Sequence, residues 1–299
     1  MSQIESAIQH TSNESGFYHV EPSLRAEFDI LQKAHDSIHE FMLLAPLCFS
    51  TDATHEVSWE NKSAFLIYHW EVFNHAHRSF IEALNTYYNV AFILLRTTLE
   101  LLLKGAFWEC LSHLRFRDNS PILDESPAGR AIKNWLRELI ETSPNIEKEL
   151  DQTSSGIFDK VGHRIEDPAF RPSVRTLVWQ LDEWGIFGSI TEAIDIVYGK
   201  LYSNLSADVH AVPNKTDIGK RIIAERPDLF EQHIDQALLR EYATTLREIM
   251  DVGIVIELNI LHDLIERFES VRPKLSERLT EMEQLGLRYG PMWARELLK

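Results

Sequence analysis

The sequence predicts an all-α protein, an antiparallel helical bundle with long helices and a helical insertion. Glycine and proline are scarce, at 12 and 11 of 299 residues, so few positions interrupt a helix. Apolar residues recur at intervals of three and four over most of the chain, which is the period of an amphipathic helix. Alternating runs of Val, Ile and Thr, which would indicate strands, extend over only a few residues. Parallel-sheet nucleotide folds are therefore disfavoured.

Composition narrows the class further. An apolar content of 44% with 10% aromatic residues is enough for a large core. The net charge of −16 disfavours diffuse binding to nucleic acid, because that affinity comes from phosphate neutralisation by Lys and Arg; a local basic patch remains compatible with it. Cys48 and Cys110 are too few for a disulfide scaffold. The N-terminus has no basic segment followed by an apolar core. We expect a cytoplasmic protein without membrane contact.

Periodicity and polar breaks divide the chain into three regions. We expect a loose leader at 1–20, a helical bundle at 21–270 with a helical insertion at about 116–188, and a C-terminal helical tail at 271–299. The bundle core is expected from about 63–114 and 190–270. The expected helices run over 22–44, 63–84, 89–108, 128–141, 145–161, 173–183, 190–211, 229–269 and 274–285.

The ends of these helices carry recognisable signals. Pro22 opens the first helix, and Pro46 with the polar stretch that follows ends it. The four residues 85–88 form a short turn, so the second and third helices should be an antiparallel hairpin. Pro213 ends the seventh helix, and Pro273 ends the eighth.

The expected helix at 89–108 is apolar almost all round, yet it carries Arg96, Glu100 and Lys104. Four-residue spacing places the three charges within about 80° on one side of a helix. No stretch reaches the roughly 18 uncharged apolar residues of a membrane span, so a buried bundle helix is expected instead. Its charges must then meet partners, and Glu100 lies one turn from Arg96.

A second polar stripe lies a hundred residues further on. Its members recur every fourth residue and cover about 120° of an α-helix: Tyr198, Tyr202, Ser206 and His210. We expect the two stripes to face each other across one polar pocket. The basic segment that follows, with Lys220 and Arg221, favours a phosphate-bearing ligand if it lies beside that pocket, and an interaction role if it lies far from it.

The segments LLRTTLELLLK and YSNLSADVH resemble uncharacterised helical families placed near the HEPN class. Those families have an Arg-x-x-x-Glu helix followed by a Tyr-x-x-x-Ser-x-x-x-His helix, and the resemblance covers roughly 63–115 and 190–260. It implies a helical, often dimeric protein in a nucleic-acid, defence or toxin–antitoxin setting, with metal-independent ribonuclease activity as one function. The Arg-x6-His pattern of such ribonucleases occurs here at Arg226–His233, where Pro227 follows the arginine, so the match straddles the start of a helix.

If the pocket is catalytic, the chemistry of its side chains indicates the role of each residue. His210 titrates near neutral pH and is the expected acid or base, while Arg96 stabilises charge on a phosphate and Glu100 holds the guanidinium. The expected ligand-binding residues are Tyr202, Ser206, Tyr198, Lys104, Lys220 and Arg221. The alternative is a buried hydrogen-bond network that joins two helices and fixes their register.

No metal or cofactor is expected. His35 and His39 have the spacing of a helical zinc motif, but Asp36 is shorter than the glutamate of that motif and no third ligand is apparent, so a solvated helix face is the expectation. His75 and His77 are two residues apart and point to different faces of a helix, which indicates packing and surface roles.

Together with the polar stripes, the resemblance implies a HEPN-like helical protein that binds RNA or a nucleotide in a buried polar pocket. Whether it is an enzyme, such as a metal-independent ribonuclease, is left open. A homo-oligomer is expected. The alternative is a non-enzymatic interaction or dimerisation module whose polar cluster is structural.

Overall fold

The computed structural model describes residues 26–49, 64–112, 172–209, 234–262 and 270–299, with single positions at 116, 124, 130, 134 and 265. The helices in these ranges are α3 (Phe28–Phe49), α4 (Ala64–Leu84), α5 (Tyr88–Ser112), α11 (Val174–Glu183), the π-helix η4 (Ile194–Tyr202), α12 (Ser203–Val209), α14 (Gln236–Ile260), α16 (Val271–Gln284) and α17 (Tyr289–Leu297). No strand occurs in the described residues, so the all-α prediction is confirmed.

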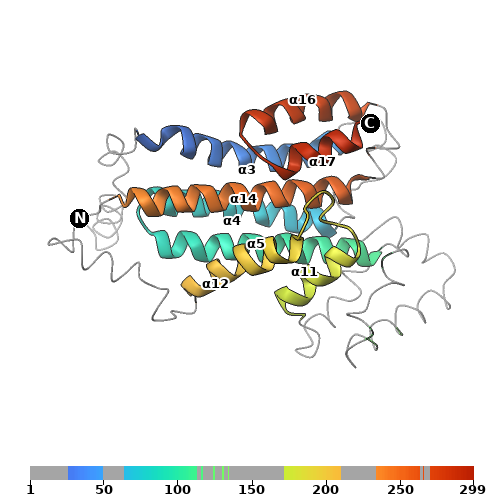
Figure 1. The fold of residues 1–299 in the computed structure, drawn as a ribbon, viewed down its shortest axis with the longest axis horizontal. Coiled ribbons are helices and arrows are strands. Elements are labelled where there is room, and N and C mark those ends of the chain that lie inside the picture. Colours follow the sequence, from blue (N-terminus) through green and yellow to red (C-terminus); the bar gives the residue numbers. More distant parts are fainter. Residues whose placement is uncertain are drawn as a thin grey trace, which may run out of the picture.

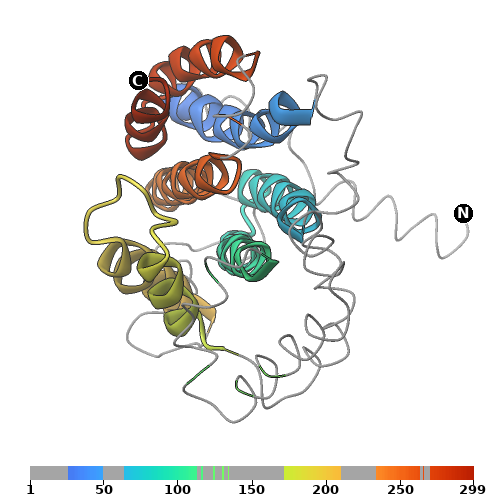
Figure 2. The same ribbon diagram turned by 90° about the vertical axis from the view of Figure 1, so that its right-hand side faces the viewer.

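The helices form three layers (Figures 1 and 2). Helix α3 with α16 and α17 makes one outer layer, α14 and α4 make the middle, and α5 with α11, η4 and α12 makes the other. The apolar core runs through all three layers, with Ile38, Phe41 and Leu99 fully buried. Helix α3 therefore belongs to the core, beside the segments at 63–114 and 190–270 from which the core was expected.

Helices α4 and α5 form the antiparallel hairpin that the sequence predicts. Their turn passes through Thr86, which takes a positive φ of 65°, and its backbone N–H donates to the carbonyl of Ala83. The two helices approach closely because Gly105 has no side chain: a Cβ there would lie 2.6 Å from the Cβ of Tyr68. This close packing fixes the register of α5, and with it the direction of the charged stripe.

Helix α14 crosses the middle of the molecule and is buried on nearly every side from Ile249 to Leu258. The structure starts this helix at Gln236 rather than near 229, because the extended residue Asp235 caps it and accepts the N–H of Leu238 at 2.9 Å. Gly253 lets two neighbours approach: a Cβ there would meet Leu102 of α5 at 3.2 Å and Phe41 of α3 at 3.3 Å.

Other boundaries also differ from the expected ones. Helix α14 ends at Ile260 rather than near 269. Helix α3 continues through Pro46 to Phe49, since Leu44 and Ala45 are still buried against the core. Helix α16 includes Pro273 in its first turn, where a proline removes no helical hydrogen bond, so Pro273 lies inside this helix.

The C-terminal segment packs on the bundle through a buried carboxylate. Asp251 of α14 accepts the backbone N–H groups of Arg288, Tyr289 and Gly290 at 2.8–3.1 Å, and so holds the N-terminus of α17. Burial raises the pKa of Asp251, and the three N–H donors oppose that shift.

The expected leader at 1–20, the helix at 145–161 and the basic segment at 214–226 lie outside the described residues, as does the helix at 128–141 apart from positions 130 and 134. Within the described part of the chain, none of the helices combines the length and the apolar character that crossing a bilayer requires.

Candidate functional site

The charged stripe of α5 faces away from the core. Leu95, Leu99 and Leu102 are fully buried on the opposite side of this helix. The side chains of the stripe become more exposed along the chain, at 17% for Arg96, 23% for Glu100 and 44% for Lys104. Arg96 and Glu100 are therefore partly desolvated, so an unpaired charge on either residue would destabilise the fold.

One carboxylate connects the stripe. Glu100 accepts the Nε–H of Arg96 at 3.0 Å and lies 3.6 Å from the Nζ of Lys104. Arg96 also donates from Nη2 to the hydroxyl of Tyr202 at 3.0 Å, and that hydroxyl donates to Glu100 at 3.4 Å. The two stripes predicted from the sequence thus meet at Arg96, Glu100 and Tyr202.

The segment that presents Tyr202 is not the α-helix that was expected over 190–211. Glu192 has a positive φ of 61°, and a π-helix then runs over Ile194–Tyr202 before α-helical geometry resumes in α12. In a π-helix the backbone hydrogen bonds join residues five apart, which makes the helix wider than an α-helix. The positions predicted for the second stripe from α-helical geometry therefore do not apply to this segment. Tyr198 still stacks on Tyr202, with ring centroids 5.7 Å apart and an interplanar angle of 19°.

A cavity of about 550 Å³ opens beside this cluster, between α4, α5, α11 and η4. Arg96, Glu100, Lys104 and Tyr202 form its polar wall. Its aromatic wall consists of Tyr68, Phe107 and Trp108. We call it the α5–α11 cavity. It has the size and the mixed lining of a small-molecule site.

The N-terminus of α11 also lines this cavity, through Pro172, Ser173 and Val174. Ser173 caps the helix and accepts the N–H of Thr176 at 3.2 Å. The N–H groups of the first helical turn carry partial positive charge, so a helix N-terminus attracts anions. The helical pattern at 173–183 predicts this helix, but nothing in the pattern connects it with the polar stripe.

The remaining predicted residues fall into two groups. Ser206 has a buried Oγ without a hydrogen-bond partner among the residues that the structure describes, and Tyr198 contacts the site through Tyr202. His210, Lys220 and Arg221 lie outside the described residues, so the position of the expected acid or base and of the basic segment stays a prediction.

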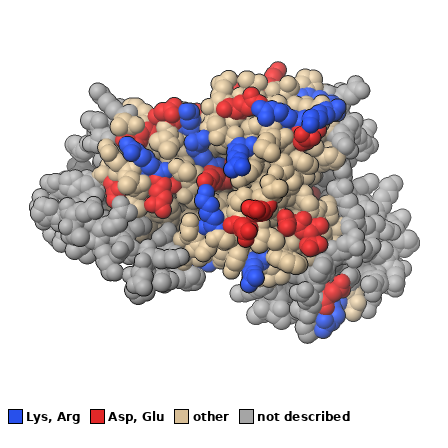
Figure 3. Space-filling model, viewed as in Figure 1, with Lys and Arg blue, Asp and Glu red and all other residues tan. Residues whose placement is uncertain are grey.

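The surface around these helices is electrostatically mixed. On the face shown in Figure 3, acidic and basic side chains are interspersed across the described residues. One example is Lys200 of η4, which donates to both carboxylate oxygens of Glu248 on α14 at 2.7 and 2.8 Å. Such a surface suits recognition of a local anionic group better than tracking along a polyanion.

Two groups of side chains that contain histidine lie elsewhere, a buried His–Glu pair and a cluster of three histidines. His69 is buried, with Nε2 3.2 Å from Glu257 of α14. Burial lowers the pKa of His69, but the negative charge of Glu257 has the larger effect, so the pKa of this imidazole is raised. Burial raises the pKa of Glu257. This pair joins α4 to α14 within the core.

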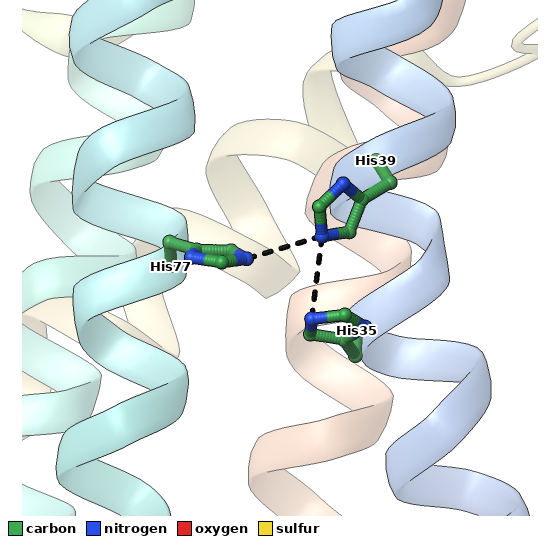
Figure 4. Close-up of side chains that lie close together, drawn as sticks. All are labelled: His35, His39 and His77. Atoms are coloured by element: carbon green, nitrogen blue, oxygen red, sulfur yellow. Dashed lines mark hydrogen bonds between the residues drawn. The ribbon is translucent and has the colours of Figure 1, made fainter.

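The second cluster brings His77 of α4 to His35 and His39 of α3 (Figure 4). The sequence analysis found the His35 and His39 pair without a third ligand, because His77 lies 38 residues further along the chain. The rings of His35 and His39 are also half-buried against α4 rather than on a solvated face.

Comparison with protein-family models, with curated proteins and with solved structures found no match to this chain. The fold and the cavity therefore define it by architecture alone, as an all-α bundle with a polar cavity beside the α4–α5 hairpin.

Proposed function

We propose that the α5–α11 cavity binds a small phosphate-bearing ligand, with a nucleotide or an RNA end as the class. The observation that carries this proposal is the shared lining of one cavity by two cationic side chains, a helix N-terminus and three aromatic side chains. Among the residues that the structure describes, Arg96 and Lys104 bring two positive charges to the polar wall and Glu100 brings one negative charge.

Each wall has a role in such binding. A phosphate group would accept hydrogen bonds from Arg96, Lys104 and the first-turn N–H groups of α11, all of which favour an anion. A nucleobase would pack against Tyr68, the half-buried member of the aromatic wall, since base–aromatic stacking contributes about 1–3 kcal/mol per base. Phe107 and Trp108 are buried and support this wall from behind. Glu100 would keep the guanidinium of Arg96 oriented while the ligand is absent.

Equilibrium binding tests this proposal directly. Isothermal titration calorimetry of the full chain with AMP, ADP, GMP and inorganic phosphate should show binding of at least one nucleotide that is tighter than binding of phosphate. Arg96→Gln should weaken that binding by at least about 10-fold, because a charge-assisted hydrogen bond contributes about 1.5–3 kcal/mol. The matched control is Arg78→Gln, which changes an exposed arginine that also pairs with a glutamate one turn away.

Ribonuclease activity is the finer proposal, and it rests on the resemblance to HEPN proteins and on His210. Incubating the protein with a mixed RNA pool in the presence of EDTA should then yield 2′,3′-cyclic phosphate ends, and His210→Ala should abolish them. Intact RNA with the wild-type protein would rule this activity out and leave nucleotide binding to be judged by calorimetry.

The alternative function is an interaction or dimerisation module. It is favoured by the way Arg96, Glu100 and Tyr202 satisfy one another, as a network that joins two helices does. Light scattering across a concentration series measures the expected homo-oligomer. A stable dimer whose mass does not depend on nucleotide, together with no nucleotide binding by calorimetry, would favour this module over the ligand site.

A further inference from the structure

Three imidazole rings converge between α3 and α4. The Nε2 atom of His39 lies 3.3 Å from Nε2 of His35 and 3.2 Å from Nε2 of His77. All three candidate ligand atoms lie within 4.8 Å of one another, and Figure 4 shows the rings pointing toward a common centre. His35 and His39 are one helical turn apart on α3, so the helix itself holds them on one face.

We propose that His35, His39 and His77 form a binding site for a divalent transition-metal ion, with Zn²⁺ as the ion that this ligand set favours. Zinc binds imidazole nitrogen at about 2.0–2.1 Å, and in tetrahedral geometry two such nitrogens lie about 3.3–3.4 Å apart. The two Nε2···Nε2 distances given above agree with that spacing. Three protein ligands leave the fourth position for a water molecule or an exogenous ligand.

Hydrogen bonding alone satisfies this cluster poorly. A neutral imidazole has one N–H and one lone pair, each on a different ring nitrogen. The Nε2 atom of His39 faces two other Nε2 atoms. It can either donate its one proton or accept with its one lone pair, so the two contacts must share that single group. A cation at the centre of the three rings uses one lone pair from each.

The protonation states also fit a metal. Burial, with the imidazole of His35 adding to it, lowers the pKa of His39 and of His77; Asp36 partly opposes the shift at His39. Both rings are thereby kept neutral, and a neutral imidazole is the form that binds a metal ion.

Neighbouring side chains orient two of the rings. His35 places Nδ1 at 3.1 Å from a carboxylate oxygen of Asp36, which favours the tautomer that leaves Nε2 free as a ligand. Gln32 donates to both oxygens of Asp36 at 2.8 Å and so fixes that carboxylate. The ring of Phe73 stacks on His77 with centroids 5.0 Å apart.

The ligand set selects against hard cations, because Mg²⁺ and Ca²⁺ prefer oxygen ligands and the three converging atoms are nitrogens. His35 additionally lines a largely apolar cavity of about 530 Å³, between α3 and α4, with Phe28, Leu31 and Phe80. A small molecule in that cavity would lie next to the metal. This site shares no residue with the α5–α11 cavity, so the two proposals can fail separately.

Metal titration of the full chain tests the site. After treatment with EDTA and desalting, the protein should bind one Zn²⁺ per chain in a competition titration with a chromophoric chelator. Co²⁺ should give the intense visible absorption of a tetrahedral complex, and Mg²⁺ should not compete. His77→Gln should weaken Zn²⁺ binding by roughly 100-fold or more, since even losing a partner outside the coordination sphere costs 10–100-fold.

His75→Gln is the matched control, because His75 lies on the same helix, two residues from His77 and outside the cluster. It should bind Zn²⁺ as the wild type does, while His39→Gln should behave like His77→Gln. Circular dichroism of each variant without metal shows that the helices are intact, and Zn²⁺ should raise the Tm of the wild type but not of His77→Gln. Zinc affinity that is unchanged in both His77→Gln and His39→Gln, or lost equally in His75→Gln, would overturn the assignment.

Discussion

The α5–α11 cavity and the histidine cluster differ in how far their polar groups satisfy one another. In the cavity, Glu100 contacts Arg96, Lys104 and Tyr202, so opposite charges and a hydroxyl already form a network. In the cluster, three like groups point at one another, and the contacts at Nε2 join only nitrogen to nitrogen. A network of unlike groups stabilises the fold without a ligand, whereas three converging imidazoles can share only few hydrogen bonds and would gain more from a cation that uses one lone pair of each.

The largest expected effect is therefore at Glu100. Glu100→Gln removes the carboxylate with which Arg96 pairs among the described residues, which should cost about 1.5–3 kcal/mol in the free energy of unfolding. Urea denaturation measures this value. Glu248→Gln, at an exposed pair with Lys200, is the control and should cost less than about 1 kcal/mol. Equal values for the two variants would remove the contrast between a structural network and a surface pair.

The next effect is the pH dependence of the cluster. The folded pKa values of His39 and His77 lie below their usual value of 6.5, so the unfolded chain binds protons more readily than the fold does. Their contribution to stability is thus complete above pH 6.5 and is lost as the pH falls from there through the folded pKa values. The titratable groups that act on His39 are His35 and Asp36 of α3, and those that act on His77 are His35 and His39.

Urea denaturation in EDTA at pH 7.5 and at pH 5 measures this dependence. The double variant His39→Gln/His77→Gln should lose less stability between the two pH values than the wild type. The other buried acids titrate in both proteins and cancel in the difference. Identical pH slopes would show that the imidazoles titrate alike in the folded and unfolded chain.

A smaller effect is expected for His77→Gln without metal. The ring is half-buried and its polar contact in the cluster is with another imidazole, so its removal in EDTA at pH 7.5 should change the free energy of unfolding by no more than about 1 kcal/mol. Chemical denaturation gives the value. A loss as large as that of Glu100→Gln would mean that the cluster is structural, like the network at Arg96.

The smallest effect on stability is expected at Lys104, which is the most exposed member of the stripe and lies 3.6 Å from Glu100. Lys104→Gln should change the free energy of unfolding by about 0.5 kcal/mol or less, as exposed ion pairs do. Nucleotide binding, measured by calorimetry, should nevertheless weaken several-fold, because a cation is lost from the cavity wall. Unchanged binding would exclude Lys104 from the ligand site.

Sequence periodicity alone determined the helical hairpin and the one-turn pairs. Helix α4 begins one residue from its expected start and ends at its expected end. The turn expected at 85–88 is one residue shorter, because α5 already begins at Tyr88. The spacing of Arg96 and Glu100, and of His35 and His39, fixed that each pair lies on one helix face. These relations are local, because the α-helical repeat places residues four apart on the same side whatever surrounds them.

Only the tertiary structure decided which faces meet. Arg96 contacts Tyr202 across 106 residues, and His77 contacts His39 across 38, through the relative rotation and register of separate helices. Many pairs of apolar helix faces can pack together, so periodicity alone does not determine which faces meet. Close helix approaches, such as that at Gly105, select among these packings. The π-helix at Ile194–Tyr202 was equally beyond the sequence, because its residues also fit an α-helical pattern and only packing selects the wider turn.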